Sequence, residues 1–222
     1  MNVCWSGARR KGIACAIGIF VGIVIAFGVS MAKAEPVRIL AFGDSLTAGY
    51  GLDQSQSFPA QLGRALAKAG IEAEIINGGI SGDTSAGGRA RLAWSMADKP
   101  DAIIVELDAN DGLRGLEPTQ TEQNLDAIIA EAKANGLAVL LCGMLAPPNL
   151  GKEYGEEFRT LFSRLANKHR VLFYRFFLEG VAAYPELNQA DGIHPNAKGV
   201  SVIVDRILPS VRKLIDQAAG RV

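Results

Sequence analysis

Five short apolar runs rich in β-branched residues alternate with longer helical patterns along this chain. The runs cover residues 37–42, 73–76, 102–107, 138–141 and 171–176. The patterns that follow them, at about 58–69, 85–96, 119–135, 153–169 and 197–218, repeat apolar residues at three- and four-residue spacing. Parallel strands need crossover connections, and continuous apolar strands are typical of a sheet that is covered on both faces. The alternation therefore predicts a single α/β domain, a three-layer α/β/α sandwich with a five-stranded, mostly parallel sheet.

Polar and glycine-rich clusters follow the first three predicted strands, and another precedes the last predicted helix. They are Gly43-Asp44-Ser45-Leu46, residues 79–85, residues 108–112 and residues 191–196. The carboxyl ends of parallel strands meet at one edge of a sheet, where ligands of open α/β proteins bind. We therefore expect these clusters to converge on one crevice.

Ser45 is the nucleophile candidate, and a serine hydroxyl needs a nearby base to become reactive. The chain has two histidines. His169 ends a helical pattern, where a solvated cation is the simpler interpretation. His194 lies in a loop bounded by glycine and proline, three residues after Asp191. A tight turn there can bring the Asp191 carboxylate to one ring nitrogen while the other faces Ser45.

Acyl transfer also needs donors around the oxygen that becomes negative in the tetrahedral intermediate. The backbone N–H groups of Ser45 and Gly82 and the side-chain amide of Asn110 are candidates. Each of these clusters alone is equally compatible with an ordinary turn. Thr84 or Ser85 is expected to cap the following helix rather than to react.

Taken in order, the clusters resemble the four sequence blocks of the SGNH (GDSL) hydrolase family. The likeness is nearest to its periplasmic thioesterase I, arylesterase and lysophospholipase branch. Gly43-Asp44-Ser45-Leu46 resembles the first block and Gly82 the second, while Asn110 resembles the third and residues 191–196 the last. Any one block is a weak signal, but four in this order are specific, and they extend over the whole chain after residue 34.

The resemblance implies a flavodoxin-like SGNH hydrolase fold and no metal or other cofactor. It implies hydrolysis of small-molecule acyl esters and thioesters through a Ser–His–Asp triad. Ser45 would be the nucleophile, His194 the base and then the acid, and Asp191 its orienting partner. Ser45, Gly82 and Asn110 would form the oxyanion hole.

Two further positions are interpreted through the same resemblance. The loop that contains Leu145, Pro147 and Pro148 is similar to the mobile acyl-chain loop of the family, which implies a role in substrate binding. Asp108 departs from the family pattern, which has glycine two residues before the oxyanion asparagine. Aspartate is among the residues that tolerate a positive φ, but a carboxylate near an oxyanion opposes its charge. We therefore predict that Asp108→Gly raises kcat/KM.

The first 34 residues have the layout of a secretory signal. Arg9-Arg10-Lys11 precedes an apolar stretch over residues 13–29, and Ala32-Lys33-Ala34 has the small residues of a cleavage site. We predict cleavage after Ala34, which leaves residues 35–222 as a hydrolase domain that is periplasmic or secreted, with no stable membrane span. An uncleaved membrane anchor is the alternative, because the stretch is close to the lower limit for spanning a bilayer, about 17 residues.

Removing residues 1–34 takes away four of the 23 basic residues and none of the 23 acidic ones, which leaves a net charge of −4. That charge argues against a nucleic-acid partner. Cys142 is then the one remaining cysteine, so no internal disulfide can form. Its apolar surroundings predict a buried, inert thiol. We expect a monomer.

The sequence thus favours a serine hydrolase that acts on acyl esters and thioesters. A carbohydrate O-deacetylase on the same scaffold is the alternative enzyme. A catalytically weakened periplasmic acyl-binding protein is the alternative outside enzymes, and Asp108 is its motivation.

Overall fold

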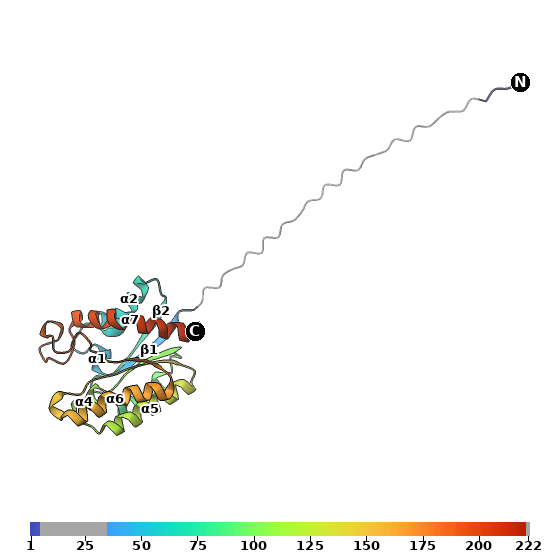
Figure 1. Cartoon of the computed structure of the whole chain (residues 1–222). Helices are drawn as coiled ribbons and strands as arrows, with labels where there is room; N and C mark the ends of the chain where they lie inside the picture. The colour runs from blue at the N-terminus through green and yellow to red at the C-terminus, as the bar shows by residue number, and fades with distance from the viewer. Residues whose placement is uncertain (5–34, 221–222) are drawn as a thin grey trace. The chain divides into compact units, whose positions relative to one another are not determined.

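The computed structural model describes residues 1–4 and 35–220, and residues 35–220 form the folded unit (Figure 1). The proposed signal segment lies almost entirely outside the described residues. Within the described residues, no helix is both long enough and apolar enough to span a bilayer.

All strand pairs in the sheet are parallel, and the strand order is β2-β1-β3-β4-β5. This is the flavodoxin-like order, in which the chain reverses direction across the sheet beside β1. The prediction of a five-stranded α/β sheet is confirmed. The strands are β1 (Val37–Gly43), β2 (Ala73–Gly79), β3 (Ala102–Glu106), β4 (Ala138–Cys142) and β5 (Leu172–Tyr174).

The last strand is shorter than the apolar run at 171–176 predicts. β5 pairs with β4 only from Leu172 to Tyr174. Beyond it, the Gly143 N–H donates to the Tyr174 carbonyl and the Phe177 N–H donates to the Gly143 carbonyl, so the chain turns across the end of β4. The apolar residues after Tyr174 are therefore used for packing and not for strand pairing.

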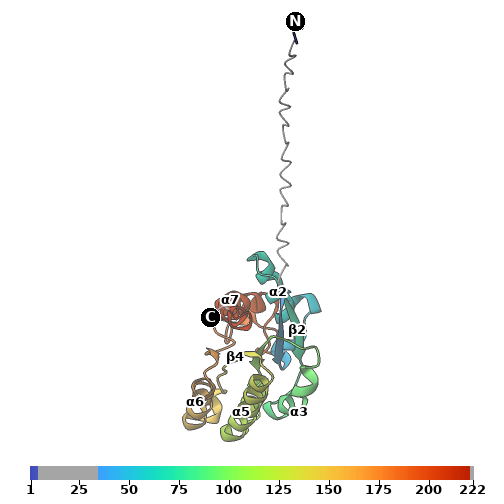
Figure 2. The ribbon, with the colours of Figure 1, turned by 90° about the vertical axis from the view of Figure 1, so that its right-hand side faces the viewer.

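Helices cover both faces of the sheet (Figure 2). α2 and α7 lie on one face, and α3, α5 and α6 lie on the other. The predicted cap of α3 is present, because the Thr84 hydroxyl accepts from the Gly87 N–H, and Pro118 is the first residue of α5. These helices are α2 (Phe58–Lys68), α3 (Ser85–Ser95), α5 (Pro118–Ala134), α6 (Lys152–His169) and α7 (Ala197–Ala218).

Two short helices are not predicted by the sequence pattern. α1 (Ser45–Ala48) follows β1 directly, and α4 (Ala109–Leu113) follows β3. Ser45 is the first residue of α1, so the polar cluster at 43–46 leads into a helix that the pattern does not predict. A helix of four or five residues is too short to show helical periodicity.

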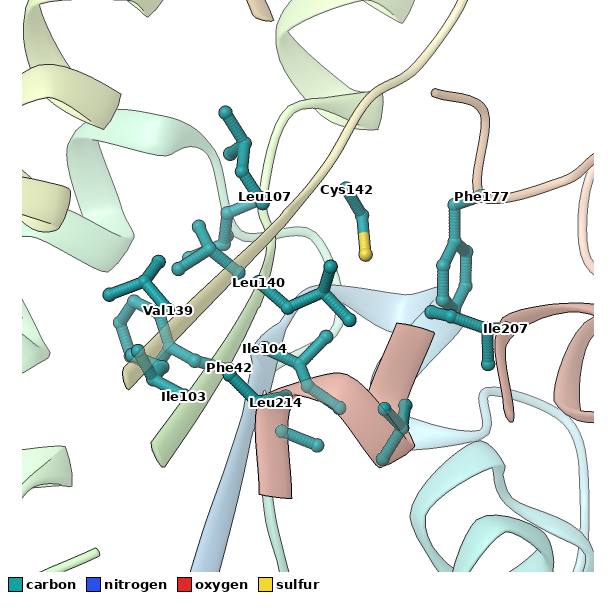
Figure 3. Packing of buried hydrophobic residues seen from close by; sticks show 14 of the residues in the cluster. Phe42, Ile103, Ile104, Leu107, Val139, Leu140, Cys142, Phe177, Ile207 and Leu214 are labelled. Atoms are coloured by element: carbon teal, nitrogen blue, oxygen red, sulfur yellow. The ribbon is translucent and has the colours of Figure 1, made fainter. Parts of the chain in front are cut away.

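One continuous core joins the sheet to both helical layers (Figure 3). Phe42, Ile104 and Leu140 of the central strands are almost fully buried, as are Ile207 and Leu214 of α7. Burying side chains of this size contributes about 1.5–3 kcal/mol each. Cys142 lies in this core, and burial raises the pKa of its thiol well above the usual range.

Candidate active site

The nucleophile candidate lies where β1 turns into α1. The Asp44 side chain caps α1 by accepting a hydrogen bond of 2.9 Å from the backbone N–H of Leu46. This cap fixes the turn that presents Ser45 at the carboxyl edge of the sheet. Ser45 is 9% exposed, which leaves its hydroxyl accessible from one side.

The structure brings Asp191 and His194 to Ser45. Nε2 of His194 lies 3.0 Å from Oγ of Ser45, and Nδ1 lies 2.7 Å from Oδ2 of Asp191. The other Asp191 oxygen accepts 3.0 Å bonds from the backbone N–H groups of Ile193 and His194. The His194 N–H, the imidazole and the Ile193 N–H together lower the pKa of Asp191 to about 2. Asp191 is thus ionised at neutral pH and aimed at the imidazole.

Asn110 lies at the start of α4, opposite Ser45 in the crevice. Its amide Nδ2 donates to Oδ2 of Asp44 at 3.1 Å and to the Asp83 carbonyl at 2.8 Å. An incoming oxyanion would therefore take over or share one of these two donors. Gly82, on the neighbouring loop, has a φ of +84°, a conformation that glycine adopts without steric cost.

A buried network below the crevice connects the loops that carry Asn110 and Gly82. Asp111 accepts hydrogen bonds from the backbone N–H of Ser85 at 2.8 Å and from the Thr121 hydroxyl at 3.0 Å. The Ser85 hydroxyl donates to the same carboxylate. Asp111 is 1% exposed. It therefore fixes the start of α3, just after Gly82, against α4, which contains Asn110.

Two arginines hold the Gly82 loop from the other side. Arg91 pairs with the Asp83 carboxylate at 2.7 Å and donates to the Gly43 carbonyl at 2.9 Å. Arg114 donates to the Gly82 carbonyl at 2.9 Å. The loop is thus tied both to the end of β1 and to the residue that follows α4.

An apolar pocket of about 450 Å³ opens beside Ser45 and His194. It has the size of a small-molecule site, and its few polar lining residues are Ser45, Asn110, Asn188 and His194. Leu145, Pro147 and Pro148, the residues assigned to an acyl-chain loop, lie along it. Its other apolar lining includes Leu46, Leu113, Met144, Phe176, Leu178 and Ile193.

Comparison with known proteins identifies the family. A sequence profile described as the GDSL-like Lipase/Acylhydrolase family matches residues 41–202. The chain belongs to this family. Esterase TesA of Pseudomonas aeruginosa is 42% identical over 184 residues, which is 82% of this chain and 92% of the relative. Thioesterase 1/protease 1/lysophospholipase L1 of Escherichia coli K12 is 39% identical over 179 residues, 80% of this chain and 85% of the relative.

A solved structure shows the same GDSL-like architecture. The crystal structure of AlinE4, an SGNH-hydrolase family esterase, superimposes with a TM-score of 0.70 at 48% sequence identity. The match covers 82% of this chain and 98% of AlinE4. The family resemblance and the SGNH hydrolase fold that it implies are therefore confirmed.

Three carboxyl groups, those of Asp44, Glu106 and Asp108, are buried close to the candidate nucleophile in the sequence of this GDSL-like protein. Burial raises the pKa of Asp44 to about 6, although the Leu46 N–H, His194 and Asn110 oppose the shift. Burial also raises the pKa of Glu106 and Asp108 well above the usual range, and Asp44 adds to both shifts. Oε2 of Glu106 accepts a 2.7 Å bond from the Thr47 hydroxyl on α1.

Asp108 differs from its sequence interpretation in its backbone. Its φ is −164°, an extended conformation that any residue adopts, so the tolerance of aspartate for a positive φ is not needed at this position. Both carboxyl oxygens are buried, and neither has a hydrogen-bond partner among the described residues. Burial disfavours the charged form of Asp108, so it favours the neutral carboxylic acid over the carboxylate.

His169 is also placed differently from the solvated cation expected at a helix terminus. It is the last residue of α6, but its side chain is only 13% exposed. Its Nε2 lies 2.6 Å from Oδ1 of Asp126 on α5, and Lys168 pairs with the same oxygen at 2.7 Å. His169 therefore connects two helices on the layer opposite α7.

Sequence reasoning missed several residues that shape the site. Glu106 carried one signal, because it is a lone carboxylate at the end of an otherwise apolar strand. The role of Asp111 could not be recognised, because it lies among other polar residues in the cluster at 108–112. Tyr50 and Gln189 gave no signal, because the contacts of Tyr50 with His194 and of Gln189 with Tyr50 join residues far apart in the sequence.

Proposed function

We propose that this protein hydrolyses acyl esters and thioesters through an acyl-enzyme formed on Ser45. One observation carries the proposal: Ser45 and His194 line the apolar pocket, His194 is hydrogen-bonded to Ser45, and Asp191 is hydrogen-bonded to His194. The names of the relatives, an esterase and a thioesterase 1/lysophospholipase L1, support the same class of reaction.

In the acylation step, Oγ of Ser45 attacks the acyl carbonyl carbon while Nε2 of His194 removes the hydroxyl proton. Asp191 keeps Nδ1 protonated and stabilises the imidazolium that forms. The lowered pKa of Asp191 suits this role, since the carboxylate stays ionised throughout the working pH range.

The carbonyl oxygen becomes negative as the tetrahedral intermediate forms. The backbone N–H groups of Ser45 and Gly82 and the amide of Asn110 are the proposed donors to it. A preorganised donor of this kind is worth about 2.7–4 kcal/mol of transition-state stabilisation. The Asp111 network and the two arginines that bind the Gly82 loop, Arg91 and Arg114, support the proposal, because they fix the donors before substrate arrives.

The imidazolium then gives its proton to the leaving alcohol or thiol, and the bond between that group and the acyl carbon breaks. Water then enters in place of the leaving group, and His194 takes a proton from it as its oxygen attacks the acyl carbon of the Ser45 ester. As this second tetrahedral intermediate collapses, the bond between the acyl carbon and Oγ of Ser45 breaks, and the His194 imidazolium returns its proton to Oγ. The products are a carboxylic acid and the free enzyme, with no redox change.

The pocket supports fatty-acyl chains as the preferred acid part of the substrate. Its lining is dominated by aliphatic side chains and Phe176, which would bury methylene groups at about 0.8 kcal/mol each. An acetyl group would leave most of this volume unused. For this reason we favour acyl esters and thioesters over the acetylated sugars of a carbohydrate O-deacetylase.

We further propose that residues 1–34 direct export and are cleaved after Ala34, so that the enzyme works in the periplasm or outside the cell as a monomer. The basic, apolar and small-residue order of this segment is the support. Amino-terminal sequencing of the exported protein tests the cleavage, and a protein that retains residues 1–34 contradicts it.

A substrate panel tests the proposed activity. Wild type, Ser45→Ala and the exposed-serine control Ser81→Ala are compared on p-nitrophenyl esters and acyl-CoA thioesters from two to sixteen carbons, and on acetylated sugars. We expect wild type and Ser81→Ala to favour medium or long acyl chains and Ser45→Ala to be inactive. Preference for acetylated sugars would favour the deacetylase. Fatty-acid binding without turnover would favour the acyl-binding protein.

A further inference from the structure

Tyr50 lies against the imidazole of His194. The two ring centroids are 4.6 Å apart and the ring planes are inclined by 38°. This separation is within the range of favourable aromatic pairs and of a cation above an aromatic face. Tyr50 is 52% exposed, so packing in the hydrophobic core does not account for its position.

The backbone of Tyr50 is anchored to the nucleophile segment. Its N–H donates to the carbonyl of Ser45 at 3.1 Å, and the Gly49 N–H donates to the same oxygen at 3.1 Å. Tyr50 therefore follows the end of α1 directly. A single short segment carries both the nucleophile and the ring that covers its base.

Gln189 joins this segment to the His194 loop. Its side-chain amide donates to the Tyr50 carbonyl at 2.7 Å and to the Pro195 carbonyl at 3.0 Å, and its backbone N–H donates to the His194 carbonyl at 2.8 Å. A Cβ atom on Gly51 would lie 2.1 Å from Oε1 of Gln189, so only glycine permits this close approach. These bonds tie the backbone at His194 and Pro195 to the segment that carries Tyr50.

We propose that Tyr50 is a positioning residue for the reaction, whose aromatic face fixes the His194 ring and stabilises the imidazolium formed during acylation. This inference rests on the proposed function of the triad. The charged groups near the ring are Asp191 at Nδ1 and the buried Asp44. Asp191 and Asp44 are both carboxyl groups. Tyr50 differs from them, because it offers an uncharged aromatic face whose quadrupole favours the imidazolium cation.

The experiment compares Tyr50→Phe and Tyr50→Leu with wild type on one p-nitrophenyl ester over a range of pH. Phenylalanine keeps the aromatic face, and leucine keeps an apolar side chain without it. We expect Tyr50→Leu to lower kcat about two- to tenfold with little change in KM, and Tyr50→Phe to retain most of the activity. The acid limb of the kcat/KM profile should move to lower pH in Tyr50→Leu, by roughly half a pH unit.

Tyr184→Leu is the matched control, because Tyr184 is also 52% exposed and, among the described residues, makes no ring contact with His194. Its kinetics should equal those of wild type. Gln189→Leu removes the side-chain clamp and leaves the Tyr50 ring in the chain. It should reproduce part of the kcat loss, and thermal unfolding of each variant shows whether the fold is retained.

Ser45→Ala separates failure of this inference from failure of the proposed function. If Ser45→Ala keeps wild-type turnover, the triad itself is wrong. If Ser45→Ala is inactive while Tyr50→Leu matches wild type in both kcat and pH profile, the role of Tyr50 alone is contradicted. Equal losses in Tyr50→Phe and Tyr50→Leu would assign the effect to the hydroxyl and would also overturn the proposal.

Discussion

Nε2 of His194 lies 3.0 Å from Oγ of Ser45, although 149 residues separate them in the sequence. β1 and α1 place the serine, and the loop before α7 places the histidine. The contact exists because both segments end at the same edge of the parallel sheet. It is a direct structural consequence of the strand order beside β1.

Replacing Asp191 tests the orientation of the base. Asp191→Asn removes the charge that stabilises the imidazolium and allows the wrong tautomer of His194. We expect kcat to fall by about 10⁴-fold with a smaller change in KM. Steady-state kinetics on a p-nitrophenyl ester measure this, with Asp205→Asn, an exposed aspartate on α7, as the control. A loss below tenfold would show that Asp191 is not the orienting partner.

Replacing Asn110 tests the oxyanion hole. Asn110→Ala should lower kcat by about 10²- to 10³-fold, since one donor to the developing charge is lost. KM should change little, because the donor acts mainly in the transition state. Asn167→Ala on the exposed surface of α6 is the control. A rise in KM at constant kcat would instead place Asn110 in ground-state binding.

Asp108 should make the protein less stable as pH rises. Its folded-state pKa is raised by burial, so above the unfolded value of about 3.9 the folded state holds a proton that the unfolded state has lost. The stability that Asp108 contributes is fully present below the unfolded pKa. It falls as the pH rises from there to the folded pKa, by at most about 1.4 kcal/mol of unfolding free energy per pH unit. Denaturant unfolding between pH 5 and 8 should show a flatter dependence in Asp108→Asn, and an unchanged slope would contradict the assignment.

The effect of Asp108 on activity should follow the same titration. Ionisation of Asp108 adds a negative charge that opposes the oxyanion, and burial moves that ionisation to higher pH. Any gain in kcat/KM for Asp108→Gly should therefore increase as the pH rises. Parallel pH profiles of the variant and wild type measure it. A variant that is never faster than wild type would show that the aspartate is harmless or useful.

The pocket should set the acyl-length preference. Ala182 lines it, and Ala182→Phe fills part of its volume. We expect the ratio of kcat/KM for dodecanoyl to butyryl esters to fall by about tenfold, since displaced methylene groups lose their apolar contacts. Ala67→Phe on the exposed side of α2 is the control for general effects of a bulky residue. An unchanged ratio would place the acyl chain elsewhere.

Much of the fold could be predicted from the sequence because its signals are local. Apolar runs and helical spacing identify β1 to β4 and the five long helices, and strand alternation implies their parallel pairing. β5 is shorter than its apolar run because the backbone of Gly143 bonds to the Tyr174 carbonyl and to the Phe177 N–H, which ends the pairing with β4. That exchange of hydrogen bonds is between distant segments and leaves no pattern in either one.

The candidate site could likewise be predicted only where its signals are local in the sequence. Ser45 could be named because it lies in a short cluster at a strand end, and Asp191 and His194 because they lie in a short cluster just before the last helix. The contacts of Glu106 with Thr47 and of Gln189 with Tyr50 could not, since their partners are 59 and 139 residues away. Whether Asp108 is charged likewise depends on burial by the complete fold.

Covalent labelling of Ser45 tests the central claim most directly. The intact protein is treated with a fluorophosphonate, and the modified residue is located by peptide mass spectrometry in wild type, Ser45→Ala, His194→Ala and Ser81→Ala. We predict a single adduct on Ser45 in wild type and Ser81→Ala and no adduct in the other two variants. An adduct on another residue, or undiminished ester turnover in Ser45→Ala, would contradict the proposed mechanism.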